Sequence, residues 1–376
     1  MKRVLIIVAA MLTGLTHAQA GGFEQPNQSA SAAGVANAFV ATANDASALM
    51  YNPAGIAWLS GVSVMGTGRL DYRDSSVQTL LRNAPNNGTE PFTGSIYATW
   101  TPRDGHLAAG FGFSPLFIAN NDWDTAFPAA VGRSASGITK LTVDHTTVDF
   151  VYALNSDLAI GAGGDWYVTR ATLTQGVQSF QGNSFTSFGG HASLMWKPFP
   201  AWSVGAMFRS GANVNMSGQA NDSLSFRLPD YVSVGIAHDF ADVWHLETDI
   251  KWTRWSALKD MNIVKGGLIS QPNPMNLRDT LTVMTGLIWT WREKTQFRIG
   301  YAYDQGANRS QNFSPVIADQ DGHRISMGIG ADAFGLHMDA AYQYIYHSKN
   351  TTTGAFAGIY KDRRQTLMMS VSAVFD

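Results

Sequence analysis

Hydrophobic and polar residues alternate with a period of two through most of this sequence. From Trp244 to Thr253, the even-numbered residues are Trp, Leu, Thr, Ile and Trp, whereas the odd-numbered residues are His, Glu, Asp, Lys and Thr. Residues 297–304, 336–347 and 366–375 separate into two sets in a similar way. Because successive side chains of a β-strand point to opposite faces, each segment predicts a strand with one apolar face and one polar face.

Two classes of β protein contain strands of this kind, the soluble sandwich and the transmembrane barrel. Many segments here are long, and aromatic residues lie near their ends, where the interfacial girdles of a membrane barrel are found. The polar face carries ionisable residues in one segment after another, as the wall of a polar lumen requires. These three features favour an all-β fold, a transmembrane antiparallel β-barrel, over the sandwich.

Short polar connections and longer tracts rich in Gly, Asn, Ser and Pro separate the segments. In bacterial barrels the short connections are periplasmic turns and the longer ones are extracellular loops. The runs between connections predict about fourteen strands, an even number as single-chain bacterial barrels have. The run 260–266 is short, and dividing 323–347 into two strands would raise the number by one. The expected strands are 62–72, 92–101, 106–118, 140–154, 157–175, 184–197, 202–217, 222–239, 243–255, 260–266, 280–291, 295–304, 323–331 with 335–347, and 366–375.

Composition excludes several classes of function. Charged residues make up 14% of the chain, against roughly 25% in soluble domains, and the net charge is −2. Nothing in such a chain makes a basic field, so we expect no nucleic-acid partner. The chain has no cysteine, and its 9 histidines lack the His-Glu-x-x-His spacing. We therefore expect no metal site and no cofactor.

The first residues have the three parts of a secretory signal peptide. They are a basic pair (Lys2-Arg3), an apolar run (4–15) and small residues around an expected cleavage point (Ala18-Gln19-Ala20). A membrane anchor is the alternative, but the apolar run is too short to cross about 30 Å of hydrocarbon. We therefore expect export to the outer membrane, removal of residues 1–20 and a mature chain that begins at Gly21.

Residues 21–60 do not alternate. They are rich in small residues, and Asp45 is placed to cap a short helix over 45–49, which Asn52-Pro53 then ends. A compact stretch of small side chains before a barrel suggests a plug inside the lumen, with the barrel itself over 61–376. A periplasmic tail is the alternative, because the pattern alone does not place this segment.

The same N-terminal residues resemble the opening of the FadL/TodX-type outer-membrane transporters. The similarity lies in Gly22-Phe23, Gln28-Ser29-Ala30-Ser31, Ala43-Asn44-Asp45-Ala46-Ser47 and Tyr51-Asn52-Pro53-Ala54-Gly55. Later stretches are also similar, and their order extends the resemblance over essentially the whole mature chain. These later stretches are 107–123, 228–235, 253–256 and 298–304.

The resemblance implies a fourteen-stranded barrel whose lumen is closed by an N-terminal hatch. It implies uptake of long-chain fatty acids or aromatic hydrocarbons, which bind outside and leave sideways through an opening in the wall beside a kinked strand. The family's ligand-contacting N-terminal Phe corresponds to Phe23. The hatch motif that faces the opening corresponds to Asn52, Pro53 and Ala54.

Two arginines and one hydrophobic stretch complete the candidate ligand-binding residues. The resemblance places Arg170 and Arg278 near the family's carboxylate site, and Arg can bind a carboxylate through two parallel hydrogen bonds. The alternation of even- and odd-numbered positions between the two faces of a strand, here called parity, puts Arg278 on the lumenal face. Arg170 has the parity of the lipid face, so it must lie beyond the membrane edge or follow a β-bulge. Phe113, Leu116 and Phe117 lie near the end of the expected third strand. They can line a substrate groove or be part of the plain lipid-facing surface, and the sequence leaves both interpretations open.

The leading hypothesis is passive uptake of hydrophobic compounds across the outer membrane by a protein that is not an enzyme. The expected partners are the hydrophobic small molecule, outer-membrane lipid and lipopolysaccharide, and we expect a monomer. The alternative is a non-specific porin or structural barrel, which would conduct small solutes without an apolar groove. A barrel hydrolase is a third class, although the chain has no Gly-x-Ser-x-Gly motif. The two arginines favour fatty acids over aromatic hydrocarbons.

Overall fold

The structure is a computed structural model, and it describes residues 22–90, 92–102, 106–123, 137–175, 178–266, 268–271, 274–292, 295–308, 319–353 and 357–375. The expected signal peptide (1–20) and the expected mature N-terminus at Gly21 lie outside these residues. Within the described ranges, no helix is long and apolar enough to cross a membrane.

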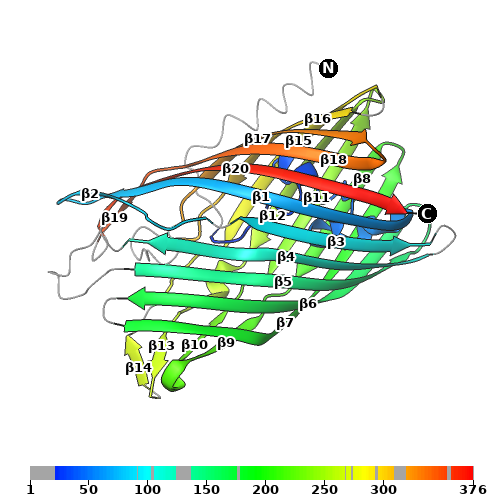
Figure 1. The fold of residues 1–376 in the computed structure, drawn as a ribbon. Helices are drawn as coiled ribbons and strands as arrows, with labels where there is room; N and C mark the ends of the chain where they lie inside the picture. The colour runs from blue at the N-terminus through cyan, green and yellow to red at the C-terminus, as the bar shows by residue number, and fades with distance from the viewer. Residues whose placement is uncertain are drawn as a thin grey trace.

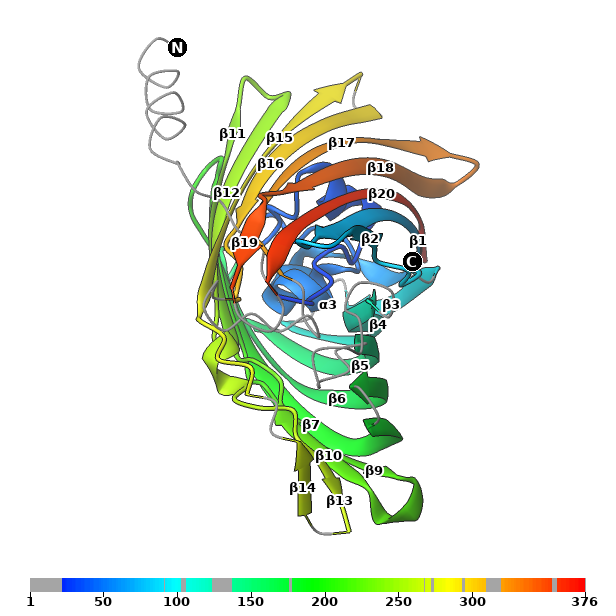
Figure 2. The same cartoon turned by 90° about the vertical axis from the view of Figure 1, so that its left-hand side faces the viewer.

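Fourteen antiparallel strands form one closed sheet. Each strand pairs with the next, and β1 closes the barrel by pairing with β20 from Val62 opposite Phe375 to Gln78 opposite Ile359. Figure 1 shows the strands along the wall, and Figure 2 shows the barrel turned by 90°. The strands are β1 (Gly61–Gln78), β3 (Thr93–Thr101), β4 (Leu107–Asp122), β5 (Gly137–Ala153), β6 (Leu158–Gln175), β7 (Gln178–Phe199), β8 (Trp202–Arg209), β11 (Tyr231–Phe240), β12 (Trp244–Thr253), β15 (Thr280–Trp291), β16 (Thr295–Asp304), β17 (Gly322–Ala333), β18 (Leu336–His347) and β20 (Gly358–Phe375).

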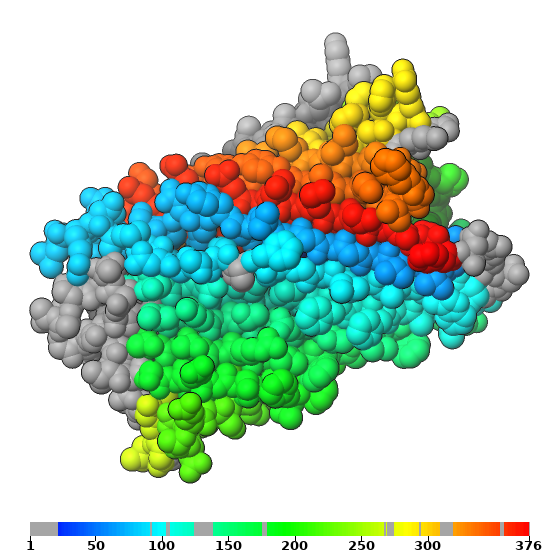
Figure 3. Space-filling model, viewed as in Figure 1, coloured from blue at the N-terminus to red at the C-terminus, as the bar shows by residue number. Residues whose placement is uncertain are grey.

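The two faces of the wall are those that the alternation predicts. In β12, Glu247 and Asp249 point inward and are buried, whereas Ile250 points outward and is 51% exposed. On the outer face, the Trp244 ring stacks on the Trp289 ring with their centroids 5.9 Å apart. Side chains of β20, β1 and the following strands cover the wall without interruption in Figure 3. An apolar outside and a charged inside are the reverse of a soluble protein, and they confirm the transmembrane barrel.

The two ends of the barrel have different connections. At one end, the turn end, neighbouring strands are joined by tight turns such as 200–201 and 334–335. At the other end, the loop end, the connections are longer and contain further short elements. These are β2 (Asn83–Pro85), β9 (Asn213–Gly218), η3 (Gln219–Asn221), β10 (Ser223–Arg227), η4 (Trp255–Ala257), β13 (Ile263–Lys265), β14 (Leu268–Gln271) and β19 (Asn350–Thr352).

The expected number of strands is confirmed, although two of the assignments behind it are wrong. Residues 260–266 contain only β13, which has 3 residues and lies outside the barrel wall. A membrane-spanning strand needs roughly 9–11 residues, so this run is too short. Residues 323–347 form two strands, β17 and β18, of 12 residues each. The first error adds one strand to the expected number and the second removes one, so the total stays at fourteen.

The N-terminal segment, residues 22–60, lies inside the barrel, where Figure 2 shows it in blue. It contains two short helices, α2 (Ala30–Gly34) and α3 (Ala48–Tyr51), and a 3-10 helix, η1 (Pro53–Trp58). The helix expected over 45–49 is wrong in its bounds. The Asp45 carboxylate accepts a hydrogen bond from the Ser47 N–H at 2.8 Å, so it closes a turn before α3 rather than capping the helix.

Small residues on both sides let this segment approach the wall closely. A Cβ atom on Gly205 of β8 would lie 2.0 Å from the Val40 carbonyl oxygen, and one on Gly300 of β16 would lie 2.3 Å from the Val35 carbonyl carbon. Real Cβ atoms do not approach backbone atoms so closely, and only glycine fits at these two wall positions. The backbone of the segment therefore packs directly on the backbone of the barrel.

Candidate ligand site at the loop end of the lumen

The wall contains a strand edge that is left without a neighbour. β3 pairs with β4 only from Trp100 opposite Ala109 to Ile96 opposite Phe113, whereas β4 continues to residue 122. A β-bulge between Pro115 and Phe117 interrupts its pairing with β5. Proline has no N–H, and a bulge bends the strand that contains it. Beyond Phe113, one edge of β4 is therefore free of β3.

The start of the N-terminal segment occupies this free edge. The Gln25 N–H donates to the Leu116 carbonyl oxygen at 2.8 Å, and the Ile118 N–H donates to the Phe23 carbonyl oxygen at 3.0 Å. Glu24 and Phe117 lie opposite each other in an isolated antiparallel bridge. Residues 23–25 thus act as a short substitute strand that satisfies backbone groups of β4.

Three aromatic rings meet beside the bridge. The Phe23 ring lies 5.4 Å from the Phe117 ring and 5.0 Å from the Trp255 ring, measured between centroids. Phe23 is 5% exposed, Phe117 2% and Trp255 0%. Such tilted aromatic contacts are each stabilising by about 0.5–1.5 kcal/mol beyond the burial of their area. The trio fixes the first residues of the N-terminal segment against β4 and η4.

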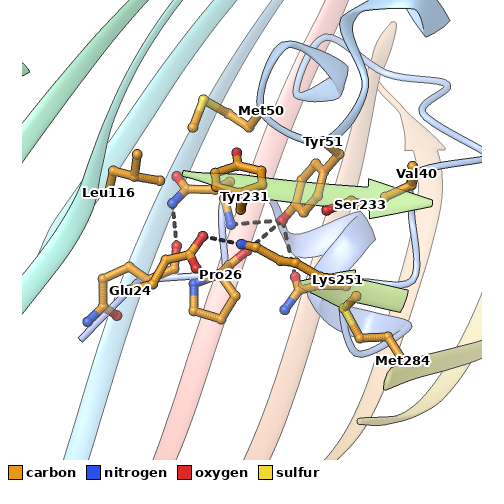
Figure 4. Close-up of a pocket in the computed structure, with 13 residues that line it drawn as sticks. Glu24, Pro26, Val40, Met50, Tyr51, Leu116, Tyr231, Ser233, Lys251 and Met284 are labelled. Carbon is orange, nitrogen blue, oxygen red and sulfur yellow. Dashed lines mark hydrogen bonds and ion pairs between the residues drawn. The ribbon is translucent and has the colours of Figure 1, made fainter. Parts of the chain in front are cut away.

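An ion pair connects the same residues to the opposite wall. The Lys251 ammonium of β12 contacts the Glu24 carboxylate and lies 4.0 Å from the centroid of the Tyr231 ring. Both side chains line a cavity of about 40 Å³ whose other walls include Met50, Leu116 and further apolar groups. Figure 4 shows Lys251 and Glu24 meeting in this cavity.

A second small cavity, of about 100 Å³, adjoins the first and is highly charged. In it, Arg73 pairs with Asp362 at 2.6 Å and Arg324 pairs with Asp304 at 2.5 Å. Both pairs join barrel residues to one another. Lys251 and Glu24 line both cavities.

Tyr51 of α3 holds the base of the site together. Its hydroxyl accepts from the Gln28 N–H at 3.0 Å and lies within hydrogen-bond distance of the Pro26 carbonyl oxygen (3.0 Å) and of Asn37 Oδ1 (3.1 Å). Burial raises the pKa of this phenol well above its ordinary value, so the group stays neutral.

The structure brings together only part of the candidate set. Phe23, Leu116 and Phe117 are buried next to one another at the bridge. Phe113 points outward and is 38% exposed, so it belongs to the lipid face. Lys251, which the sequence identified only as one member of an inward-facing charged set, is the cation that lines both cavities.

The two arginines lie elsewhere. The Arg170 side chain is 61% exposed on the outer face, where its Nη1 pairs with Asp144 at 2.5 Å. Although the β6–β7 pairing shifts register between Tyr167 and Thr169, Arg170 stays on the outer face. Arg278 lies at the loop end, where its Nε donates to the Gly306 carbonyl oxygen at 2.8 Å and its Nη2 lies 3.4 Å from Asp321. Neither arginine lines the two cavities.

The Asn52-Pro53-Ala54 motif is hydrogen-bonded to β7 of the wall. Asn52 Nδ2 donates to the Val40 carbonyl oxygen at 2.7 Å and to the Leu194 carbonyl oxygen of β7 at 3.0 Å. The Ala54 N–H donates to Ser193 Oγ of β7 at 3.0 Å, and Pro53 begins η1. In α3, Met50 Sδ accepts a hydrogen bond from Ser114 Oγ of β4 at 3.5 Å.

Within the described residues, no group of three or more His, Cys, Asp or Glu side chains could hold a metal ion. The features on which identification depends are the apolar outer band, the charged lumen and the chain's own N-terminal segment inside that lumen. They define a β-barrel of the outer membrane with a segment of its own chain in the lumen. The chain belongs to the OMPP1/FadL/TodX family of outer-membrane transport proteins, because the model of that family, described as "Outer membrane protein transport protein", matches residues 11–207 and 179–374.

Individual relatives are distant but cover nearly the whole chain. The sequence is 23% identical to outer membrane protein P1 of Haemophilus influenzae, over 92% of this chain and 90% of that protein. It is 21% identical to the long-chain fatty acid transport protein of Salmonella typhi, over 90% and 89%. The structure resembles a Pseudomonas aeruginosa FadL homologue with a TM-score of 0.81 and 18% sequence identity, over 94% of this chain and 100% of that chain. It also resembles the P. putida toluene transporter TodX with a TM-score of 0.65 and 16% identity, over 91% of this chain and 98% of that chain. At these identities, the solved structures show the fold.

Proposed function

We propose that the protein takes up hydrophobic compounds passively across the outer membrane. Relatives described as a long-chain fatty acid transport protein and a toluene transporter support this class of substrate. Lipopolysaccharide hinders direct partitioning of such molecules, so a protein that offers them an apolar path is useful to the cell. Substrate enters at the loop end, which we place outside the cell.

The observation that carries the proposal is the pairing of residues 23–25 with the free edge of β4. The cavities beside these residues are only about 40 and 100 Å³, so the path is closed in this state. When residues 23–25 leave, the aromatic trio separates and the edge of β4 beyond Phe113 loses the residues that pair with it. Substrate then leaves sideways through this gap into the membrane. The N-terminal segment is a hatch of which the first residues are the moving part.

The opening is driven by ligand binding alone. A ligand shifts the equilibrium only if it binds the open arrangement more tightly than the closed one. An apolar molecule does so by taking the place of the Phe23 ring against Phe117 and Trp255. No energy source is needed, because the substrate moves down its own gradient.

Deleting the moving residues tests the proposal. Removal of Gly22–Gln25 takes away the seal, so we expect the initial rate of toluene uptake by a transporter-deficient strain to rise several-fold. Deleting Leu80 and Leu81, which are exposed at the loop end, is the matched control and leaves the rate unchanged. An unchanged rate in the first variant, with the folded barrel present in the membrane, would contradict the proposal.

The filled lumen favours this function over a non-specific porin. In planar bilayers, the intact protein is expected to show no steady conductance for small ions. A permanently open pore in that experiment would support the porin instead.

A further inference from the structure

We propose that Phe23-Glu24 is a built-in mimic of a long-chain carboxylic acid, and that Lys251 is the residue that binds the substrate's carboxylate. The proposal rests on the proposed function and narrows its substrate to molecules with a hydrocarbon chain and a single carboxylate. In the closed state, Phe23 supplies the hydrocarbon and Glu24 the carboxylate. In the open state, the substrate supplies both.

The geometry places both halves of the mimic on the part of the chain that moves. Phe23 packs in the aromatic trio, and the neighbouring Glu24 carboxylate contacts the Lys251 ammonium. The side chain of Glu24 is 10% exposed and that of Lys251 14% exposed, so water replaces little of their interaction. Because successive side chains of a strand point to opposite sides, the two groups fill an apolar position and a position beside a cation on the two sides of the same stretch of backbone.

Lys251 differs from the other cations of the lumen. Arg73, Arg298 and Arg324 pair with Asp362, Asp339 and Asp304, and all these carboxylates belong to barrel strands. Among the ion pairs of the described residues, the Lys251 pair is the one whose carboxylate lies on the N-terminal segment. Opening the hatch therefore removes the partner of this cation and leaves the other pairs intact.

The cost of an unpaired buried charge then selects the substrate. Removing one partner of a buried pair is strongly unfavourable, because the remaining charge has neither water nor a counter-ion. A neutral hydrocarbon that opens the hatch leaves the ammonium alone against the Tyr231 ring. A carboxylate restores the pair. The exchange of Glu24 for a fatty acid is nearly balanced in charge, whereas the exchange for a hydrocarbon is not.

Binding of oleate and oleyl alcohol to the purified, folded mature protein tests the proposal. The two ligands have the same chain, so the ratio of their dissociation constants reports the open state alone. Lys251→Met is expected to reduce the preference for oleate by on the order of 30-fold, the effect typical of truncating a buried charge pair. Lys265→Met is the control, because this lysine pairs with Asp222 at the loop end and lines neither cavity.

Glu24→Gln acts on the closed state instead. It removes the internal competitor, so both ligands are expected to bind about tenfold more tightly while their ratio stays the same. The double variant Glu24→Gln with Lys251→Met leaves neither partner of the pair charged and alone. If Lys251→Met by itself fails to fold, the ratio of the dissociation constants for oleate and oleyl alcohol is measured in the double variant instead. An unchanged ratio without Lys251 would overturn its role in binding carboxylate, and unchanged affinities without Glu24 would overturn the mimic. If the wild-type protein binds neither ligand, the proposed function itself fails.

Discussion

The N-terminal segment has two regions that are attached to the barrel in different ways. The first region, residues 22–28, is held on β4 by two main-chain hydrogen bonds, on β12 by the Glu24 ion pair and on β3 by the Tyr97 hydroxyl, which donates to the Gln28 carbonyl oxygen at 3.0 Å. The second region, residues 30–56, is held by inward-pointing side chains. The Asp249 carboxylate accepts from the N–H groups of Phe39 (2.8 Å) and Val40 (3.0 Å).

The attachments of the second region continue around the barrel. Gln343 Nε2 of β18 donates to the Ala33 carbonyl oxygen at 2.7 Å, and the Ala30 N–H donates to Ser370 Oγ of β20 at 2.8 Å. Composition differs between the regions, because the second is rich in alanine and other small residues whereas the first contains Phe23, Glu24 and Gln25. The polar partners of the second region also come from more barrel strands. The comparison leads us to expect that residues 22–28 leave the wall more readily than residues 30–56.

The largest effect is expected from removing an anchor of the second region. Asp249→Ala leaves the N–H groups of Phe39 and Val40 without partners inside the lumen, and each unsatisfied group costs about 1–3 kcal/mol. Residues 30–56 should then undock and the barrel should conduct ions in planar bilayers. Asp239→Ala, which changes an exposed carboxylate near the turn end, is the control and should stay closed. A closed Asp249→Ala barrel would mean that the second region is not held by this carboxylate.

A somewhat smaller effect is expected from crowding the same region. Gly300→Val places methyl groups on the Val35 backbone, and such overpacking typically costs about 1–3 kcal/mol. Elastase, which cleaves after small residues, should then cut within residues 30–56 several times faster. Gly66→Val adds the same group on the outer face, where a Cβ meets nothing within 4 Å, and should leave the cleavage rate unchanged. Equal rates of elastase cleavage in Gly300→Val and Gly66→Val would show that close packing at Gly300 does not hold residues 30–56 in place.

A moderate effect, confined to the first region, is expected from Phe23→Ala. Loss of the ring removes its contacts with Phe117 and Trp255 and weakens the attachment of residues 22–28. Because the chain contains no cysteine, Gln25→Cys and Ala38→Cys can each be labelled with a maleimide. We expect Phe23→Ala to speed labelling at position 25 about tenfold and to leave position 38 protected. Faster labelling at both positions would show that the two regions move together.

The smallest effect is expected from Arg170→Gln. This arginine forms an exposed ion pair on the outer face, and such pairs contribute roughly 0–1 kcal/mol. Oleate uptake should change less than about twofold, far less than in Lys251→Met. A large loss of oleate uptake would show that Arg170 takes part in substrate binding or transport after all.

The faces of the strands could be predicted from the sequence, but the ends of their pairing could not. Alternation in residues 244–253 placed Glu247 and Asp249 inside, because the direction of a side chain is a local property. The free edge of β4 depends on where β3 stops, and no local pattern records this. At Arg170, parity correctly indicated the outer face, whereas transfer of a role from the family pointed to the lumen.

The residues of the candidate site show the same contrast between what a local pattern predicts and what depends on the folded chain. Phe23, Leu116 and Phe117 were predicted separately, and the structure brings them together through hydrogen bonds between distant parts of the chain. Lys251 was identified only as an inward charge, because its partner Glu24 lies 227 residues away in the sequence. The resemblance implied that the Asn52-Pro53-Ala54 motif faces the lateral opening, and this stays a prediction; its hydrogen bonds to β7 follow from the folded backbone alone.

A reversible lock between the first region and β4 tests the central claim most directly. Glu24 and Phe117 form a non-hydrogen-bonded antiparallel pair, in which Cα atoms lie about 4.5 Å apart, a spacing that a disulfide can bridge. In the variant Glu24→Cys with Phe117→Cys, uptake of oleate should stop when the two cysteines are oxidised to a disulfide and return on reduction, while each single variant is unaffected by the oxidant. Equal uptake by the oxidised and reduced protein would show that residues 23–25 do not have to leave β4.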